Sequence, residues 1–138
     1  MASYVKYEAF IENLCNKLID IFGTMDTLKV ALGSNAPNVA THSVLTDVTQ
    51  LTGTGYTAGG GNSQTTSTRT GGTVTLVSVD FVWTATAGDW TAGRYVVYYD
   101  DTSTSKNLIS YWDYGANFTL LNGETFTVDF GASTATLA

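Results

Sequence analysis

The first 22 residues and the rest of the chain space their hydrophobic side chains differently. In residues 4–22, apolar side chains recur three and four positions apart, which is typical of an amphipathic helix. The positions are Tyr7, Phe10, Ile11, Leu14, Leu18 and Ile21. Cys15, Ile19 and Phe22 widen this stripe. A stripe this broad suggests contact with both the domain's own sheet and a partner, although a helix that only caps one end of the domain is the alternative.

From Thr73 onward the spacing changes to a period of two, which predicts β-strands. Val79, Phe81 and Trp83 alternate with other side chains, and the run 94–99 (RYVVYY) is apolar on both faces. A strand that is apolar on both faces belongs in the centre of a sheet. We expect residues 108–112 to pair with it across the polar loop 100–107.

Further strands are expected at residues 28–32, at 134–137 and, more weakly, at 44–51. The dipeptide Asn122–Gly123 separates two alternating runs, 118–121 and 124–130. Asn-Gly favours a type I′ turn, because both of its central residues need positive φ. A β-hairpin is therefore predicted here.

These elements predict one mainly β domain. A chain of 138 residues fits a single domain. With seven or eight short strands and no helix between them, the expected fold is an antiparallel β-sandwich, of jelly-roll or immunoglobulin-like topology. The predicted organisation is one domain over 1–138, with a helix at 4–22 and a sandwich at 27–138. The sandwich carries a long polar loop at 53–72.

Charge and hydropathy narrow the range of partners. The formal net charge is −6, and the six Lys and Arg residues are scattered along the chain. Without a basic stripe for phosphate contacts, we expect no direct binding of nucleic acid. An acidic surface also repels anionic membranes, and no stretch is apolar enough to span one. The N-terminal residues lack the features of a signal peptide, so synthesis in a cytoplasm is expected.

Reactive side chains are few. The single cysteine, Cys15, excludes an intrachain disulfide, and we expect it to be a core thiol. His42, the single histidine, falls in a polar loop. Asp100 and Asp101 mark a hairpin tip, where a bound cation is possible but turn formation is the commoner role. The sequence therefore predicts no enzyme, no cofactor and no metal site, and it leaves open whether a cation binds at Asp100–Asp101.

The motifs as a set resemble small virion structural proteins of tailed bacteriophages. They are the opening helix followed by DTLKVAL (26–32), SNAPN (34–38), GYTAGG (55–60), RYVVYYDDTSTSKNLISYWDYG (94–115) and NGETFTVDF (122–130). The resemblance covers most of the chain, and its motifs are structural.

The resemblance implies a capsid decoration, or cement, protein on the capsid exterior. Such a protein binds the outer surface of the major capsid protein lattice and stabilises the head, as a homo-oligomer such as a dimer or trimer. Two alternatives stay open: a tail or fibre component that binds carbohydrate for host attachment, and a head–tail joining or tail-tube subunit. Because Tyr, Trp and Arg dominate protein interfaces, the predicted contact residues are Tyr56, Arg69, Trp90 and Arg94.

Overall fold

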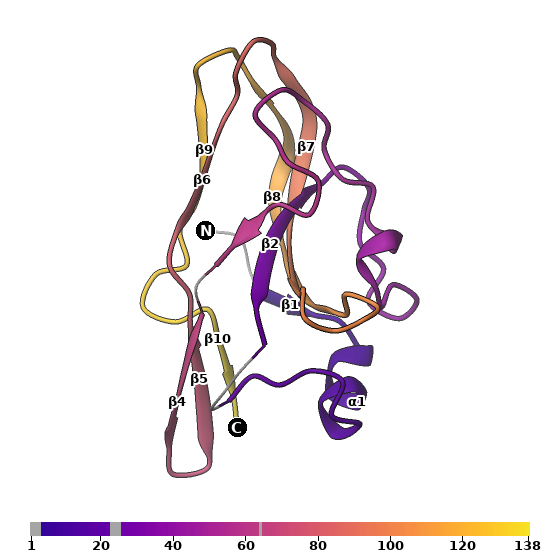
Figure 1. The fold of residues 1–138 in the computed structure, drawn as a ribbon, viewed down its shortest axis with the longest axis vertical. Helices are drawn as coiled ribbons and strands as arrows, with labels where there is room; N and C mark the ends of the chain where they lie inside the picture. The colour runs from indigo at the N-terminus through magenta and orange to yellow at the C-terminus, as the bar shows by residue number, and fades with distance from the viewer. Residues whose placement is uncertain (1–3, 23–25, 64) are drawn as a thin grey trace.

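The computed structural model describes residues 4–22, 26–63 and 65–138. Within them the protein is mainly β, with antiparallel sheets and one short α-helix near the N-terminus, which confirms the predicted fold class (Figure 1). The helices are α1 (Ala9–Cys15) and the 3-10 helix η1 (Leu45–Asp47). The strands are β1 (Tyr4–Lys6), β2 (Leu28–Gly33), β3 (Gly61–Asn62), β4 (Thr66–Thr70), β5 (Thr73–Val77), β6 (Phe81–Thr84), β7 (Trp90–Asp100), β8 (Leu108–Leu120), β9 (Thr125–Val128) and β10 (Ala135–Leu137).

One layer of the sandwich-like arrangement is a five-stranded sheet in the order β1-β8-β7-β2-β3. Strand β7 lies in its centre and pairs antiparallel with β8 and β2. This confirms both the central strand predicted at 94–99 and its pairing with 108–112. The strand predicted at 28–32 is β2 and the one predicted at 134–137 is β10.

The second layer is a long antiparallel ribbon that bends in the middle. Strands β5 and β6 follow one another along one side, and β9 and β10 run back along the other (Figure 1). At the bend, Ser78 N donates to Thr134 Oγ1 and Phe130 N donates to Asp80 Oδ1. Strand β4 adds to β5 at one end as a hairpin.

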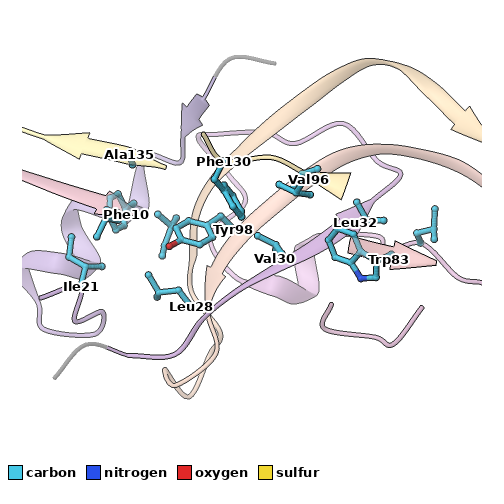
Figure 2. Packing of buried hydrophobic residues seen from close by; sticks show 14 of the residues in the cluster. Phe10, Ile21, Leu28, Val30, Leu32, Trp83, Val96, Tyr98, Phe130 and Ala135 are labelled. Carbon is cyan, nitrogen blue, oxygen red and sulfur yellow. The ribbon is translucent and has the colours of Figure 1, made fainter. Parts of the chain in front are cut away.

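Both faces of the five-stranded sheet are buried, as the RYVVYY run predicts. On one face Val96 and Tyr98 join the main core between the layers, where they lie near Phe130 and Val30 (Figure 2). On the other face Val97 and Tyr99 join a second cluster with Leu45 and Val48, which the segment after β2 supplies. Because most of the aromatic strand residues are used in this way, they are core side chains first.

The helix predicted over 4–22 is wrong in its extent. Residues 4–6 form β1, which pairs with Ser110–Trp112 of β8. The helix ends after Cys15 because Lys17 adopts a left-handed φ of 58°. Leu18 N then donates to Asn13 O and Lys17 N to Leu14 O, which is the Schellman arrangement. The apolar spacing continues beyond the helix, but the backbone turns away.

The hairpin predicted at Asn122–Gly123 is also wrong. A tight turn does form there, since Glu124 N donates to Leu121 O. Gly123 has a positive φ of 89° and Asn122 does not, so the turn is of type II and not type I′. Strands β8 and β9 therefore diverge after the turn, and β9 pairs with β6 in the other layer.

Two segments expected to be irregular or extended differ from prediction. The polar loop predicted at 53–72 contains β3 and β4, which pair with β2 and β5. Its Gln64 lies outside the described residues. The strand predicted at 44–51 is instead the helix η1, flanked by isolated bridges at Val44 and Gln50.

Candidate functional site

Two of the four predicted contact residues have structural roles. Trp90 is 0% exposed, and its Nε1 donates to Thr54 O at 2.9 Å. Tyr56 is half-buried against it, with ring centroids 5.8 Å apart, and its hydroxyl accepts from Leu32 N at 3.0 Å. Trp90 has no exposed surface for a partner, so the structure does not support it as a contact residue.

The two arginines lie at the surface, on different layers. Arg69 is exposed on β4 and donates to Gly71 O. Arg94, on β7, makes a two-point ion pair with Asp113 of β8, at 2.7 Å from Nε to Oδ1 and 2.9 Å from Nη2 to Oδ2. The hydrogen bond from Arg94 lowers the pKa of the Asp113 carboxyl. The structure therefore does not gather Tyr56, Arg69, Trp90 and Arg94 into one site.

The expected core position of Cys15 is wrong, because its side chain is exposed at the end of α1. The helix ends there and leaves the thiol outside the core. His42 lies in the predicted loop, where its Nδ1 accepts from Asn38 N at 3.3 Å. That bond uses the imidazole to close a turn of the loop.

The two neighbouring carboxylates at the end of β7, Asp100 and Asp101, have different surroundings. Asp101 forms ion pairs with Lys29 and Lys106, and the Lys106 hydrogen bond lowers its pKa. Asp100 is fully buried, and its Oδ1 accepts from the backbone N–H groups of Thr102 and Ser103. Its Oδ2 receives no hydrogen bond from an N–H or hydroxyl group. Burial, together with the nearby Asp26 carboxyl, raises the pKa of Asp100 to about 7.

Metal binding at this loop gains no support from the neighbouring side chains. Among residues 4–22, 26–63 and 65–138, no group of three His, Cys, Asp or Glu side chains is placed to hold a metal ion. Turn formation accounts for Asp100 Oδ1, and the two lysines account for Asp101. A protonated Asp100 facing the Asp26 carboxyl explains the loop without a cation.

Asp100→Asn should remove a pH dependence of stability. The folded pKa of Asp100 lies above its unfolded value, so its stabilising protonated form is fully present below about pH 4 and is lost as the pH rises to about 7. Relative to Asp100→Asn, the wild type should lose roughly 3–4 kcal/mol of unfolding free energy between pH 4 and pH 8. Urea titrations at a series of pH values measure this difference.

Asp101→Asn is the matched control, because the pKa of Asp101 is lowered and its contribution has the opposite sign. Relative to Asp101→Asn, the wild type should lose stability as the pH falls toward and below about 4. A flat difference between the wild type and Asp100→Asn between pH 4 and pH 8 would contradict a buried, protonated Asp100.

An aromatic groove lies where the two layers meet along β8 and β9. Its volume is about 460 Å³. Two groups of contacting rings border it: Tyr4, Trp112 and Phe130 form the first, and Tyr114 and Phe126, with Phe118 packed behind them, form the second. Within the second group Phe118 and Phe126 stack at 4.4 Å, while in the first Trp112 lies 5.7 Å from Phe130. The groove lining also includes Val96, Val128 and Asp129.

Exposed apolar side chains concentrate in the N-terminal segment. Among the described residues seven large hydrophobic side chains are exposed, and three of them come from residues 11–22. Ile11 is 40% exposed, Leu18 52% and Phe22 46%, while Ile19 and Ile21 between them are buried. Part of the wide apolar stripe in the sequence therefore packs on the protein, and part faces outward.

The aromatic groove and this apolar segment are the two surfaces that sequence reasoning did not resolve. The width of the stripe hinted at the second, but nothing in the sequence brings β8 and β9 to either side of a groove. No helix in the described part of the chain is long and apolar enough to cross a membrane. Comparison of the chain with protein-family models, with curated proteins and with solved structures finds no match.

Proposed function

We propose that this protein is a structural component of a tailed bacteriophage virion that decorates the capsid. It binds the outer surface of the major capsid protein lattice as a homo-oligomer and stabilises the head. The observation that carries the proposal is that three large apolar side chains within residues 11–22, those of Ile11, Leu18 and Phe22, are exposed. Apolar side chains left exposed together in one segment are typical of a protein-binding surface.

The physical mechanism is mass action. A protein that binds only the assembled shell stabilises it by an amount that grows with free concentration over Kd, and the gain repeats at every site. An interface of about 1,600 Å² is the ordinary size for such specific attachment. The net charge of −6 suits a protein on the exterior, away from packaged DNA.

The first test is copy number. Quantitative gel analysis of purified particles should show the protein at a level comparable to the major capsid protein, and labelled particles should carry it on the head. Only a few copies per particle, or labelling confined to the tail, would contradict decoration and favour a tail or joining role. Particles stripped of the protein should also lose resistance to osmotic shock.

The second test addresses the contact surface. Leu18→Ser and Phe22→Ser should each weaken binding to stripped particles by about tenfold, because both remove apolar area from the interface. Val79→Ser is the matched control, since Val79 is 55% exposed but lies between β5 and β6. Equal loss for all three variants would contradict the N-terminal segment as the contact.

A further inference from the structure

Strand β9 has one edge that no other described strand covers. It pairs with β6 on one side only, from Phe81 opposite Val128 to Thr84 opposite Thr125. Next to this ladder, Ala85 N donates to Glu124 O. Along an antiparallel strand, successive residues direct their backbone groups to opposite sides. The backbone of Phe126 and Val128 therefore hydrogen-bonds to β6, while Thr125 and Thr127 direct their backbone N–H and C=O groups outward.

This free edge borders the aromatic groove. Residues 126–130 of the ribbon form one wall, and Tyr4, Trp112 and Tyr114 of the other layer form the opposite wall. Tyr114 is 60% exposed, although its ring packs edge-on against that of Phe126 with 5.7 Å between the ring centroids. The groove thus combines unpaired backbone groups with apolar rings, which are the two features that an added strand needs.

We propose that the groove binds an extended segment of a partner protein, which adds a strand to β9. Alternate side chains of that segment enter between the ring groups around Trp112 and Tyr114. The side chains of an extended chain alternate every residue, so apolar side chains on one face can fill the groove while its backbone bonds to Thr125 and Thr127.

Charge specifies the partner segment further. Asp129 lines the groove, none of the described lining residues is basic, and the whole chain carries a net charge of −6. A segment with alternating apolar residues and flanking Lys or Arg is therefore complementary. This inference concerns β9 and the groove, and it does not depend on the capsid proposal.

The polar groups of the groove favour a peptide over a sugar. Thr134 Oγ1 already accepts from Ser78 N, and Asp129 Oδ1 accepts from Gly131 N. Recognition of a sugar needs several side-chain partners for its hydroxyls, and these two are partly occupied, which leaves the hydroxyl groups of Thr127, Ser133 and the tyrosines. The free backbone of Thr125 and Thr127 instead matches the repeating donors and acceptors of an extended chain.

The experiment selects binders from a library of random 12-residue peptides on the wild-type protein. One selected peptide is then titrated into ¹⁵N-labelled protein. We expect selected sequences to alternate apolar residues between basic flanks, and shifts to centre on the amides of 125–129 and the Trp112 indole. N-methylation of alternate peptide residues should abolish binding in one register and spare it in the other, because only one set of N–H groups faces β9.

Three variants test the geometry with the same peptide. Thr127→Pro removes an outward N–H and should weaken binding at least tenfold, while Tyr114→Ser should weaken it about fivefold. Val82→Ser is the matched control, because Val82 is an exposed side chain opposite Thr127 on β6, and its binding should stay within twofold. Amide spectra establish whether each variant is folded. If Thr127→Pro does not fold, the N-methylated peptides still test the proposal on the wild-type protein.

Several outcomes would overturn the proposal. They are a library without enrichment, selected peptides that shift amides elsewhere, and N-methylated peptides that bind equally in both registers. Shifts at the groove with oligosaccharides but not with peptides would assign it to a sugar. Concentration-dependent self-association that shifts 125–129 would assign the edge to a second copy of this chain.

Discussion

Trp90→Ala should lower the free energy of unfolding by about 3–5 kcal/mol, the usual cost of removing a large buried aromatic side chain. The Trp90 side chain is fully buried, contacts the Tyr56 ring and donates to Thr54 O. A Cβ placed on Gly53 would lie 2.3 Å from the Trp90 ring, which shows how closely the backbone packs on it. Urea denaturation followed by fluorescence measures the loss.

Tyr114→Ala is the control for Trp90→Ala, because Tyr114 is aromatic but 60% exposed. It should cost about 1 kcal/mol or less. Trp90→Phe should fall between the two, since it keeps a ring but loses the hydrogen bond to Thr54 O, which then accepts from Thr86 N alone. A loss below about 1 kcal/mol for Trp90→Ala would show that the site collapses around the missing side chain. Because Trp90 is buried, weaker partner binding by Trp90→Ala would indicate a loss of folded protein and not the loss of a contact.

Gly60→Ala should cost about 3 kcal/mol or more, because two effects add at this position. Gly60 has a left-handed φ of 67°, which costs an L-residue roughly 1–2 kcal/mol. In addition, a Cβ there would lie 1.7 Å from Val30 O, a backbone atom in β2 that cannot turn aside. The segment before β3 must shift to relieve that overlap, and the β2–β3 pairing shifts with it.

Gly71→Ala separates the two effects. Gly71 has nearly the same φ, 60°, in the turn between β4 and β5, but nothing lies within 4 Å of its added Cβ. It should therefore cost only the conformational part, about 1 kcal/mol. Thermal and urea denaturation of both variants measures the difference. Equal costs for Gly60→Ala and Gly71→Ala would mean that the close approach to Val30 is relieved at little cost.

The periodicity of apolar side chains was sufficient to predict the positions of strands that have at least one buried face. The run 94–99 is apolar on both faces and lies in the centre of the larger sheet, with Val96 and Tyr98 in one core and Val97 and Tyr99 in the other. Strands β2 and β10 were also placed correctly, whereas the strands predicted separately at 108–112 and 118–121 are parts of one strand, β8. Burial forces the alternation of these strands, and so the pattern remains visible in the sequence.

Local sequence patterns gave the wrong structure where a residue range pairs with a strand that is distant in the chain. Residues 4–6 have helical spacing, yet they pair with β8, because the edge beside Ser110–Trp112 offers hydrogen bonds and a Trp112 ring for Tyr4. Asn122–Gly123 makes a turn as expected, but Phe81–Thr84 provides the partner for β9. Propensity acts over a few residues, and tertiary pairing overrides it.

The candidate surfaces show the same division. Contact residues were predicted from residue type, because Tyr, Trp and Arg are common in interfaces. Residue type alone does not distinguish the buried Trp90 from the exposed Tyr114. The groove exists only because β8 and β9 diverge after their shared turn and leave the edge of β9 uncovered.

The sequence by itself determined a mainly β chain, its central strand and the apolar character of its N-terminal segment. Those properties follow from the alternation that burial imposes on neighbouring residues. Only the tertiary structure decided the end of the helix at Cys15, the partner of β9 and the aromatic side chains that reach the surface. The physical reason is that exposure and strand pairing depend on residues far apart in the chain, such as Phe81 with Val128, and no local pattern records which of them meet.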